Sequence, residues 1–258
     1  MSKKKSNSTR RAEQLAASER AAAVRREQER AERRRRNVFI GAGVALVLAL
    51  VVGIAYAVQS SRDTTGVTAT PPAGVVGDYG VPYGDETAPV TVTIFEDFMC
   101  PFCGDLEAAT GDVLDELVAS GDVRVDYRVL SFLDRASNGT DYSTRATSAL
   151  GVVLDQAGPE AAVTFHDLLF ENQPEEDTGG LSDDELVQLA VEAGADEASV
   201  RGPIEDRAFE QWVANATDAA SKAGVAQTPT VQVDGETLDY NTTEDLVAAL
   251  RAAVAAAG

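Results

Sequence analysis

The stretch Val90-Thr-Val-Thr-Ile-Phe-Glu-Asp-Phe-Met-Cys-Pro-Phe-Cys103 decides the fold of this chain. Its first half has the β-branched and aromatic residues that are typical of a strand, and residues 104–119 have a helical pattern. Cys100 is therefore expected at the N-terminus of a helix. Pro101 fits the first helical turn, where its missing N–H costs no hydrogen bond. Cys103 follows about one turn later, on the same face of the helix.

Cys100 and Cys103 are the only cysteines among 258 residues, and their spacing favours a reversible dithiol–disulfide couple. The thiolate attacks in thiol–disulfide exchange, and unpaired N–H groups at a helix N-terminus stabilise it. We therefore assign Cys100 as the exposed nucleophile and Cys103 as the resolving thiol.

Three other interpretations of the cysteine pair are less favoured. A zinc site would need four ligands, and one Cys-x-x-Cys supplies two. Two inert buried thiols do not suit a strand–helix junction. A static disulfide across so short a loop would stabilise little. The sequence indicates no metal and no organic cofactor.

The rest of the chain predicts further strands and helices around this junction. Residues 123–130 alternate like a half-buried strand. Residues 230–233 and 236–239 flank Asp234-Gly235, which is a hairpin signal. Helices are expected at 143–157, 159–171, 182–193, 196–223 (with a break at Gly202-Pro203) and 243–256. This order predicts an α/β domain over residues 75–258, with a helical insertion at about 140–205.

Charge separates the N-terminal segment from this domain. Residues 1–36 hold 13 of the 22 Lys and Arg and 5 of the 42 Asp and Glu, a net charge of +8. That leaves nine basic and 37 acidic residues in the other 222, a net charge of −28. So acidic a domain repels nucleic acid, and we expect no nucleic-acid partner.

A membrane anchor is predicted at residues 37–58. Val38–Val58 is 21 residues without a charge, which as a helix spans about 31 Å, close to the apolar thickness of a bilayer. Four arginines precede it, so the basic and partly helical residues 1–36 are expected in the cytoplasm. A polar linker at 59–74 would then lead to an extracytoplasmic domain of a single-pass cell-membrane protein. A signal peptide cleaved after Ala55-Tyr56-Ala57 is the alternative.

Three other side chains were weighed for a role in chemistry. Glu96 and Asp97 stand between the strand and the cysteines, and either is a candidate to relay a proton to or from Cys103. The alternative for both is a solvated acid at a strand end. His166 lies in an amphipathic helical segment, where we expect a surface or boundary histidine.

Two segments resemble a known family. Phe95-Glu-Asp-Phe-Met-Cys-Pro-Phe-Cys103 resembles the active-site segment of DsbA-like proteins of the thioredoxin superfamily, and Gly224-Val-Ala-Gln-Thr-Pro-Thr-Val231 resembles their cis-proline loop. The resemblance implies a thioredoxin fold with a cis bond before Pro229, which would lie beside the cysteine pair with a catalytic role. Thr228 would pair with an extended substrate like an added strand, and Pro101 and Phe102 would join it in substrate binding.

The resemblance also implies a function. It implies a thiol:disulfide oxidoreductase that forms disulfides in exported proteins. A membrane quinone-linked thiol oxidase, DsbB-like or VKOR-like, would then reoxidise it. A reductase or isomerase of extracytoplasmic disulfides and a non-redox binding or chaperone module are the alternatives.

Two positions depart from the family pattern. Phe102 stands where the best-known member has His, so a less oxidising couple is expected. Ile94 stands where thioredoxin has a buried acid, so proton transfer must use water, Glu96 or Asp97.

Overall fold

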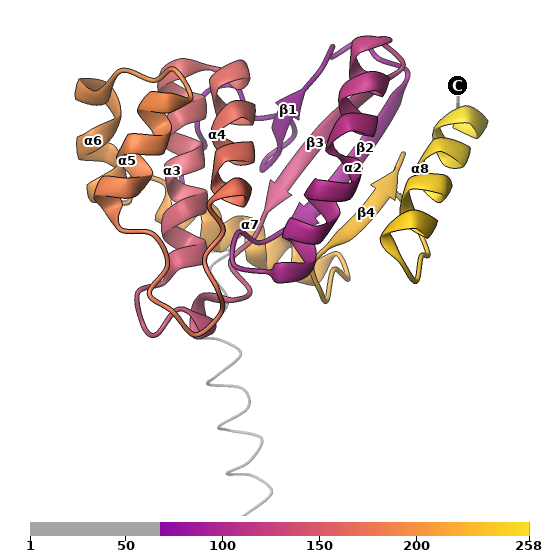
Figure 1. Ribbon diagram of the computed structural model, residues 1–258. Coiled ribbons are helices and arrows are strands. Elements are labelled where there is room, and N and C mark those ends of the chain that lie inside the picture. The colour runs from indigo at the N-terminus through magenta and orange to yellow at the C-terminus, as the bar shows by residue number, and fades with distance from the viewer. Residues whose placement is uncertain (1–67, 258) are drawn as a thin grey trace, which may run out of the picture. The chain divides into compact units, whose positions relative to one another are not determined.

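A five-stranded sheet with the strand order β1-β3-β2-β4-β5 forms the centre of the protein (Figure 1). The computed structural model describes residues 68–257. The parallel strands β2 and β3 lie in the middle, and β1, β4 and β5 are antiparallel to their neighbours. The strands are β1 (Val81–Tyr83), β2 (Val90–Glu96), β3 (Val123–Val129), β4 (Thr230–Val233) and β5 (Glu236–Thr237). The predicted α/β class is confirmed.

Helices cover both faces of the sheet. They are α2 (Pro101–Ala119), α3 (Tyr142–Ala157), α4 (Pro159–Glu171), α5 (Asp183–Glu192), α6 (Glu197–Glu205), α7 (Glu210–Lys222) and α8 (Thr243–Ala257), with a short 3-10 helix at Asp134–Ala136. Helices α2 and α8 pack against each other on one face, α2 against β3 and α8 against β4 (Figure 1). On the other face, Ala220 of α7 joins Phe95 and Leu130 in an apolar cluster. Phe95 points away from α2 because side chains alternate along β2.

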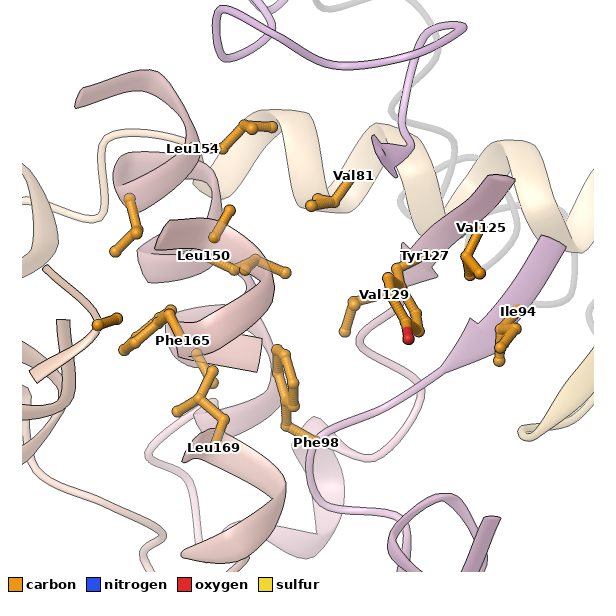
Figure 2. Packing of buried hydrophobic residues seen from close by; sticks show 14 of the residues in the cluster. Val81, Ile94, Phe98, Val125, Tyr127, Val129, Leu150, Leu154, Phe165 and Leu169 are labelled. Carbon is orange, nitrogen blue, oxygen red and sulfur yellow. The ribbon is translucent and has the colours of Figure 1, made fainter. Parts of the chain in front are cut away.

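Helices α3 to α6 follow β3 and precede β4 in the sequence. In space they form a separate helical layer beside the sheet (Figure 1). Almost every residue of α3 is buried, because α4, α5, α6 and α7 all pack against it. Phe165 and Leu169 of α4 pack with Phe98, which follows β2, and Leu150 and Val129 belong to the same core (Figure 2). This shared core holds the loop before the cysteines between the sheet and the helical layer.

The structure differs from the sequence prediction in three elements. Strand β1 was not predicted, because a run of three residues beside turn-forming residues gives too short a pattern. Strand β5 ends at Thr237, two residues earlier than expected. Helix α6 runs through Pro203, where a break was predicted. Pro203 has no N–H and so removes one hydrogen bond from α6. Val200 and Ile204 are both buried on one face of the helix, and their packing compensates for this lost hydrogen bond.

The predicted basic segment and membrane anchor, residues 1–58, lie outside the described residues, as does most of the linker. Pro72 is buried and the N–H of Ala73 donates a hydrogen bond to Asp155 of α3 at 2.8 Å, so the chain is already packed there. Within residues 68–257, no helix combines the length and the apolar character needed to cross a membrane.

Candidate active site

Cys100 is the N-cap of α2, next to the N–H groups of the first turn. Pro101 occupies the first helical position, as predicted. The backbone N–H groups of Phe102 and Cys103, and the thiol of Cys103, lie close enough to the Cys100 sulfur to lower its pKa. Both cysteines are free thiols in this structure. The predicted nucleophile therefore lies where a helix N-terminus stabilises negative charge.

The two thiols have opposite acidities. The hydrogen bond from Cys103, aided by the N–H groups of the first turn and opposed by partial burial, lowers the pKa of Cys100 to about 6. Complete burial, followed by the interactions with Cys100 and Glu96, raises the pKa of Cys103 far above its usual range. At neutral pH the pair is therefore one thiolate, at Cys100, and one thiol, at Cys103.

We expect the alkylation rate of reduced Cys100 by iodoacetamide to rise with pH and to reach half its plateau near pH 6, because only the thiolate reacts. The measurement is peptide mass spectrometry of the full-length chain after timed exposure between about pH 4 and about pH 9. The Cys103→Ala variant loses the main hydrogen bond to the thiolate, so its midpoint should lie at higher pH. A wild-type midpoint near the ordinary thiol pKa of about 8.5 would contradict this assignment.

The loop before β4 places a cis proline beside Cys100. The Thr228–Pro229 bond is cis, as the resemblance implied, and the Cys100 thiol donates to the Thr228 carbonyl oxygen at 3.4 Å. Thr228, Pro229 and Phe102 line one groove, with a volume of about 630 Å³, together with Leu106, Tyr240 and Leu246. Phe102 is 71% exposed, whereas Cys100 is only 4% exposed, so the expectation of an exposed nucleophile is wrong. A second polypeptide lying in this groove would meet the sulfur of Cys100 and an apolar ring beside it.

Glu96 lies on the side of β2 that faces α2. The alternation along β2 puts it on the same face as Val92 and Ile94, and it is completely buried. Its negative charge is close enough to raise the pKa of Cys103. The interpretation of Glu96 as a solvated acid is therefore wrong.

Asp97 is also completely buried, so the solvated interpretation is wrong for it too. Its carboxylate accepts hydrogen bonds from Met99 N–H, Leu133 N–H and Ser143 Oγ, at 2.9, 2.9 and 2.6 Å. Burial raises the pKa of Asp97 to about 6, and the three hydrogen bonds oppose that rise. This side chain ties the loop before Cys100 to α3.

His166 of α4 is buried against Glu96, so the expectation of a surface or boundary histidine is wrong. Its Nε2 lies 2.7 Å from Glu96 Oε1, and its Nδ1 lies 3.1 Å from Asp167 Oδ1. Burial alone would lower the pKa of His166, but the carboxylates of Glu96, Asp167 and Glu107 together outweigh burial and raise the pKa to about 10. The helical spacing of the buried residues Ala162, Phe165, His166 and Leu169 was the sequence signal for this position.

Two residues that sequence reasoning missed complete the surroundings. Gln173 donates from Nε2 to the carbonyl oxygens of Phe98 and Cys100, at 3.1 and 2.9 Å. A Cβ at Gly104 would clash with the Gln173 side-chain oxygen, so a larger residue there would displace the Gln173 side chain. Glu107, one turn beyond Cys103 on α2, faces Glu96, and burial together with the Glu96 charge raises its pKa. Gln173 gave no sequence signal, because it lies in a loop 70 positions after Cys103.

Comparisons with known proteins agree with this geometry. The thioredoxin family model matches residues 78–252. A disulfide bond oxidoreductase (DsbG) from Mycobacterium tuberculosis superposes with a TM-score of 0.59 and 30% identity, over 69% of this chain and 91% of that chain. DsbA from the same organism gives a TM-score of 0.57 and 30% identity, over 70% of this chain and 100% of that chain.

The chain is also similar to part of a longer protein. It is 36% identical over 124 residues to the serine/threonine-protein kinase PknE of Mycobacterium tuberculosis, which is 47% of this chain and 22% of the kinase. The chain thus spans about a fifth of the length of this relative.

Proposed function

Because the chain belongs to the thioredoxin family and its described domain is that of a disulfide oxidoreductase, we propose a direction for its reaction. We propose that the protein forms disulfides in exported proteins. The observation that carries the proposal is the unequal thiol pair. Cys100 has a lowered pKa and lies beside Thr228, which lines a groove, and Cys103 is a buried thiol one turn away. A stabilised Cys100 thiolate favours the reduced form of the pair, which makes its disulfide an oxidant.

The reaction transfers two electrons from a substrate dithiol to the Cys100–Cys103 disulfide. A substrate thiolate attacks Cys100 Sγ, the bond between the two cysteines breaks, and Cys103 leaves and takes up a proton. A second substrate thiolate then attacks the substrate sulfur of the mixed disulfide. The new substrate disulfide forms, and Cys100 leaves as a thiolate, which its low pKa makes easy. Attack by Cys103 on the mixed disulfide is the competing reverse step.

Glu96 is the side chain that we propose for proton exchange with Cys103. It is buried on the α2 side of the sheet, and its charge acts on the Cys103 thiol. Asp97 is the second candidate, but three hydrogen-bond donors already surround its carboxylate. The structure therefore favours Glu96 for the proton and Asp97 for holding the loop.

The groove beside Cys100 is the proposed substrate site. An extended segment would pair with the backbone of Thr228 next to Pro229, like one added strand. Phe102 would supply apolar contact that needs no particular sequence, which suits an enzyme acting on many reduced proteins. Pro101 is exposed at the start of α2 and borders the same sulfur.

We also propose the location and the electron acceptor. The uncharged stretch Val38–Val58 and the arginines before it support a single-pass protein with its domain outside the cytoplasmic membrane. There, a quinone-linked thiol oxidase of the DsbB-like or VKOR-like class would reoxidise the dithiol.

The reduction potential tests the direction of electron flow. We expect the full-length chain, equilibrated with glutathione buffers and quenched for mass spectrometry, to have a potential more oxidising than about −200 mV, because the Cys100 thiolate stabilises the reduced form. It should be less oxidising than about −120 mV, since Phe102 replaces a histidine that could pair with the thiolate. A potential near −270 mV would instead favour the reductase or isomerase.

A further inference from the structure

A buried cluster of Glu96, Glu107 and His166 lies beside the dithiol. One ligand atom from each residue, two carboxylate oxygens and one imidazole nitrogen, lies within 4.8 Å of the other two. Within the described residues, Glu96 Oε2 and Glu107 Oε1 are both buried without a hydrogen-bond partner. Buried carboxylate oxygens are costly to leave unpaired. His166 contacts Glu96 through the other carboxylate oxygen, Oε1, so these two unpaired oxygens are left free to bind a cation.

The surroundings of His166 are those of a metal-binding histidine. Its Nε2 points at Glu96, and its Nδ1 lies 3.1 Å from the carboxylate of Asp167. Histidines that bind metals almost always donate their other ring N–H to a carboxylate or carbonyl, which fixes the orientation of the ring. Tyr127, Phe98 and Phe170 pack around the imidazole and hold it further. Asp167 is thus placed as the outer partner of a carboxylate–histidine–metal arrangement.

The cluster also has an entry path from solvent. Glu107 and Asp167 line a cavity of about 370 Å³ on the outer side of the cluster, and three further acids, Asp112, Asp115 and Glu171, line the same cavity. A cavity lined by one sign of charge concentrates ions of the other sign. Cations would therefore be drawn toward Glu107, which borders both the cavity and the buried acid Glu96.

We propose that Glu96, Glu107 and His166 bind one divalent transition-metal cation, such as Zn²⁺. Two carboxylates and one imidazole are a donor set that suits Zn²⁺, whereas Ca²⁺ and Mg²⁺ prefer oxygen ligands alone. The fourth coordination position would face the acidic cavity and take water. A bound cation would occupy the Glu96 carboxylate. Glu96 could then no longer exchange a proton with Cys103 while the metal is bound. This consequence rests on the proposed role of Glu96, whereas metal binding itself needs neither cysteine.

Metal binding is tested in a full-length chain that carries Cys100→Ser and Cys103→Ser, so that thiols cannot bind the ion. We expect calorimetric titration with Zn²⁺ to give one site per chain. Glu107→Gln and His166→Gln in this background should each weaken binding by at least about 10-fold. Asp112→Asn is the matched control, because it removes a charge from the same cavity without touching the cluster, and it should leave the affinity within about twofold.

Two further measurements separate binding from misfolding. Zn²⁺ should raise the melting temperature of the cysteine-free chain and of Asp112→Asn, but not that of Glu107→Gln. Co²⁺ should give the visible absorption of a low-coordinate nitrogen–oxygen site without a thiolate band. Absence of saturable binding would overturn the proposal, and so would equal weakening by Asp112→Asn and Glu107→Gln. The first result would indicate that the two acids share a proton, and the second that cations bind diffusely. Neither outcome bears on disulfide formation, since the test chain has no thiols.

Discussion

The full-length chain with Cys100→Ala should oxidise a reduced test protein at least about 1000-fold more slowly than the wild type, which is within the range for removal of a catalytic nucleophile. The Cys100 sulfur lies 3.4 Å from the carbonyl oxygen of Thr228, which lines the groove. Cys103 cannot replace it, because it is completely buried and its pKa is raised far above its usual range. The measurement is the rate of disulfide formation in the test protein, followed by mass spectrometry after acid quenching.

The matched control for this prediction is Cys103→Ala. It keeps the Cys100 sulfur as a nucleophile, with a higher pKa, but removes the thiol that would release a partner from the mixed disulfide. Mixed disulfides should therefore accumulate on Cys103→Ala and be visible on a non-reducing gel, whereas Cys100→Ala should capture none. Identifying the captured proteins would give the substrates directly. Full function in the chain that lacks both cysteines would refute the enzyme and favour a non-redox binding or chaperone module.

The second large effect is on stability. His166→Leu should lower the free energy of unfolding by about 3–5 kcal/mol, because it leaves the Glu96 carboxylate buried without its charged partner. Lost contacts between the imidazole and the rings of Tyr127 and Phe170 would add to this cost. The measurement is urea unfolding of the full-length chain in the presence of a metal chelator, so that no bound cation contributes.

The pH dependence of this stability difference has a definite sign. The pKa of His166 is raised from 6.5 to about 10 in the folded protein. The stabilisation by the charged imidazole is therefore fully present below about pH 6.5 and is lost as the pH rises toward 10. The difference between wild type and His166→Leu should shrink over that interval.

Asp167→Asn is the control for His166→Leu. It alters the partner of the other ring nitrogen, and the Asp167 side chain is 55% exposed. Solvent screens such a pair, so we expect a loss of less than about 1 kcal/mol. A loss below about 1 kcal/mol for His166→Leu itself, or a difference that grows with pH, would show that Glu96 and His166 do not form a charged pair.

The sequence by itself determined the local features of the active site. A β-branched run followed by Cys-Pro-Phe-Cys and a helical pattern placed Cys100 at a helix N-terminus, since each of these signals depends on residues next to one another. In the structure, Ser182 begins α5 with a capping box, which likewise depends on residues close to one another in the sequence. The alternation of side chains along β2 also places Glu96 on the same face as the apolar residues Val92 and Ile94, which is the sequence signal for its burial.

Only the tertiary structure decided what surrounds the cysteines. Thr228 lies 128 positions from Cys100 in the sequence, and His166 lies 70 positions from Glu96. No local pattern records such pairs, because they arise when the helical layer and the loop before β4 fold back onto the sheet. A buried imidazole also looks like a surface one in an amphipathic helix until its acidic partner is known. The acidity of each thiol depends on these distant groups as well as on its own helix, so its chemistry becomes visible only in the folded protein.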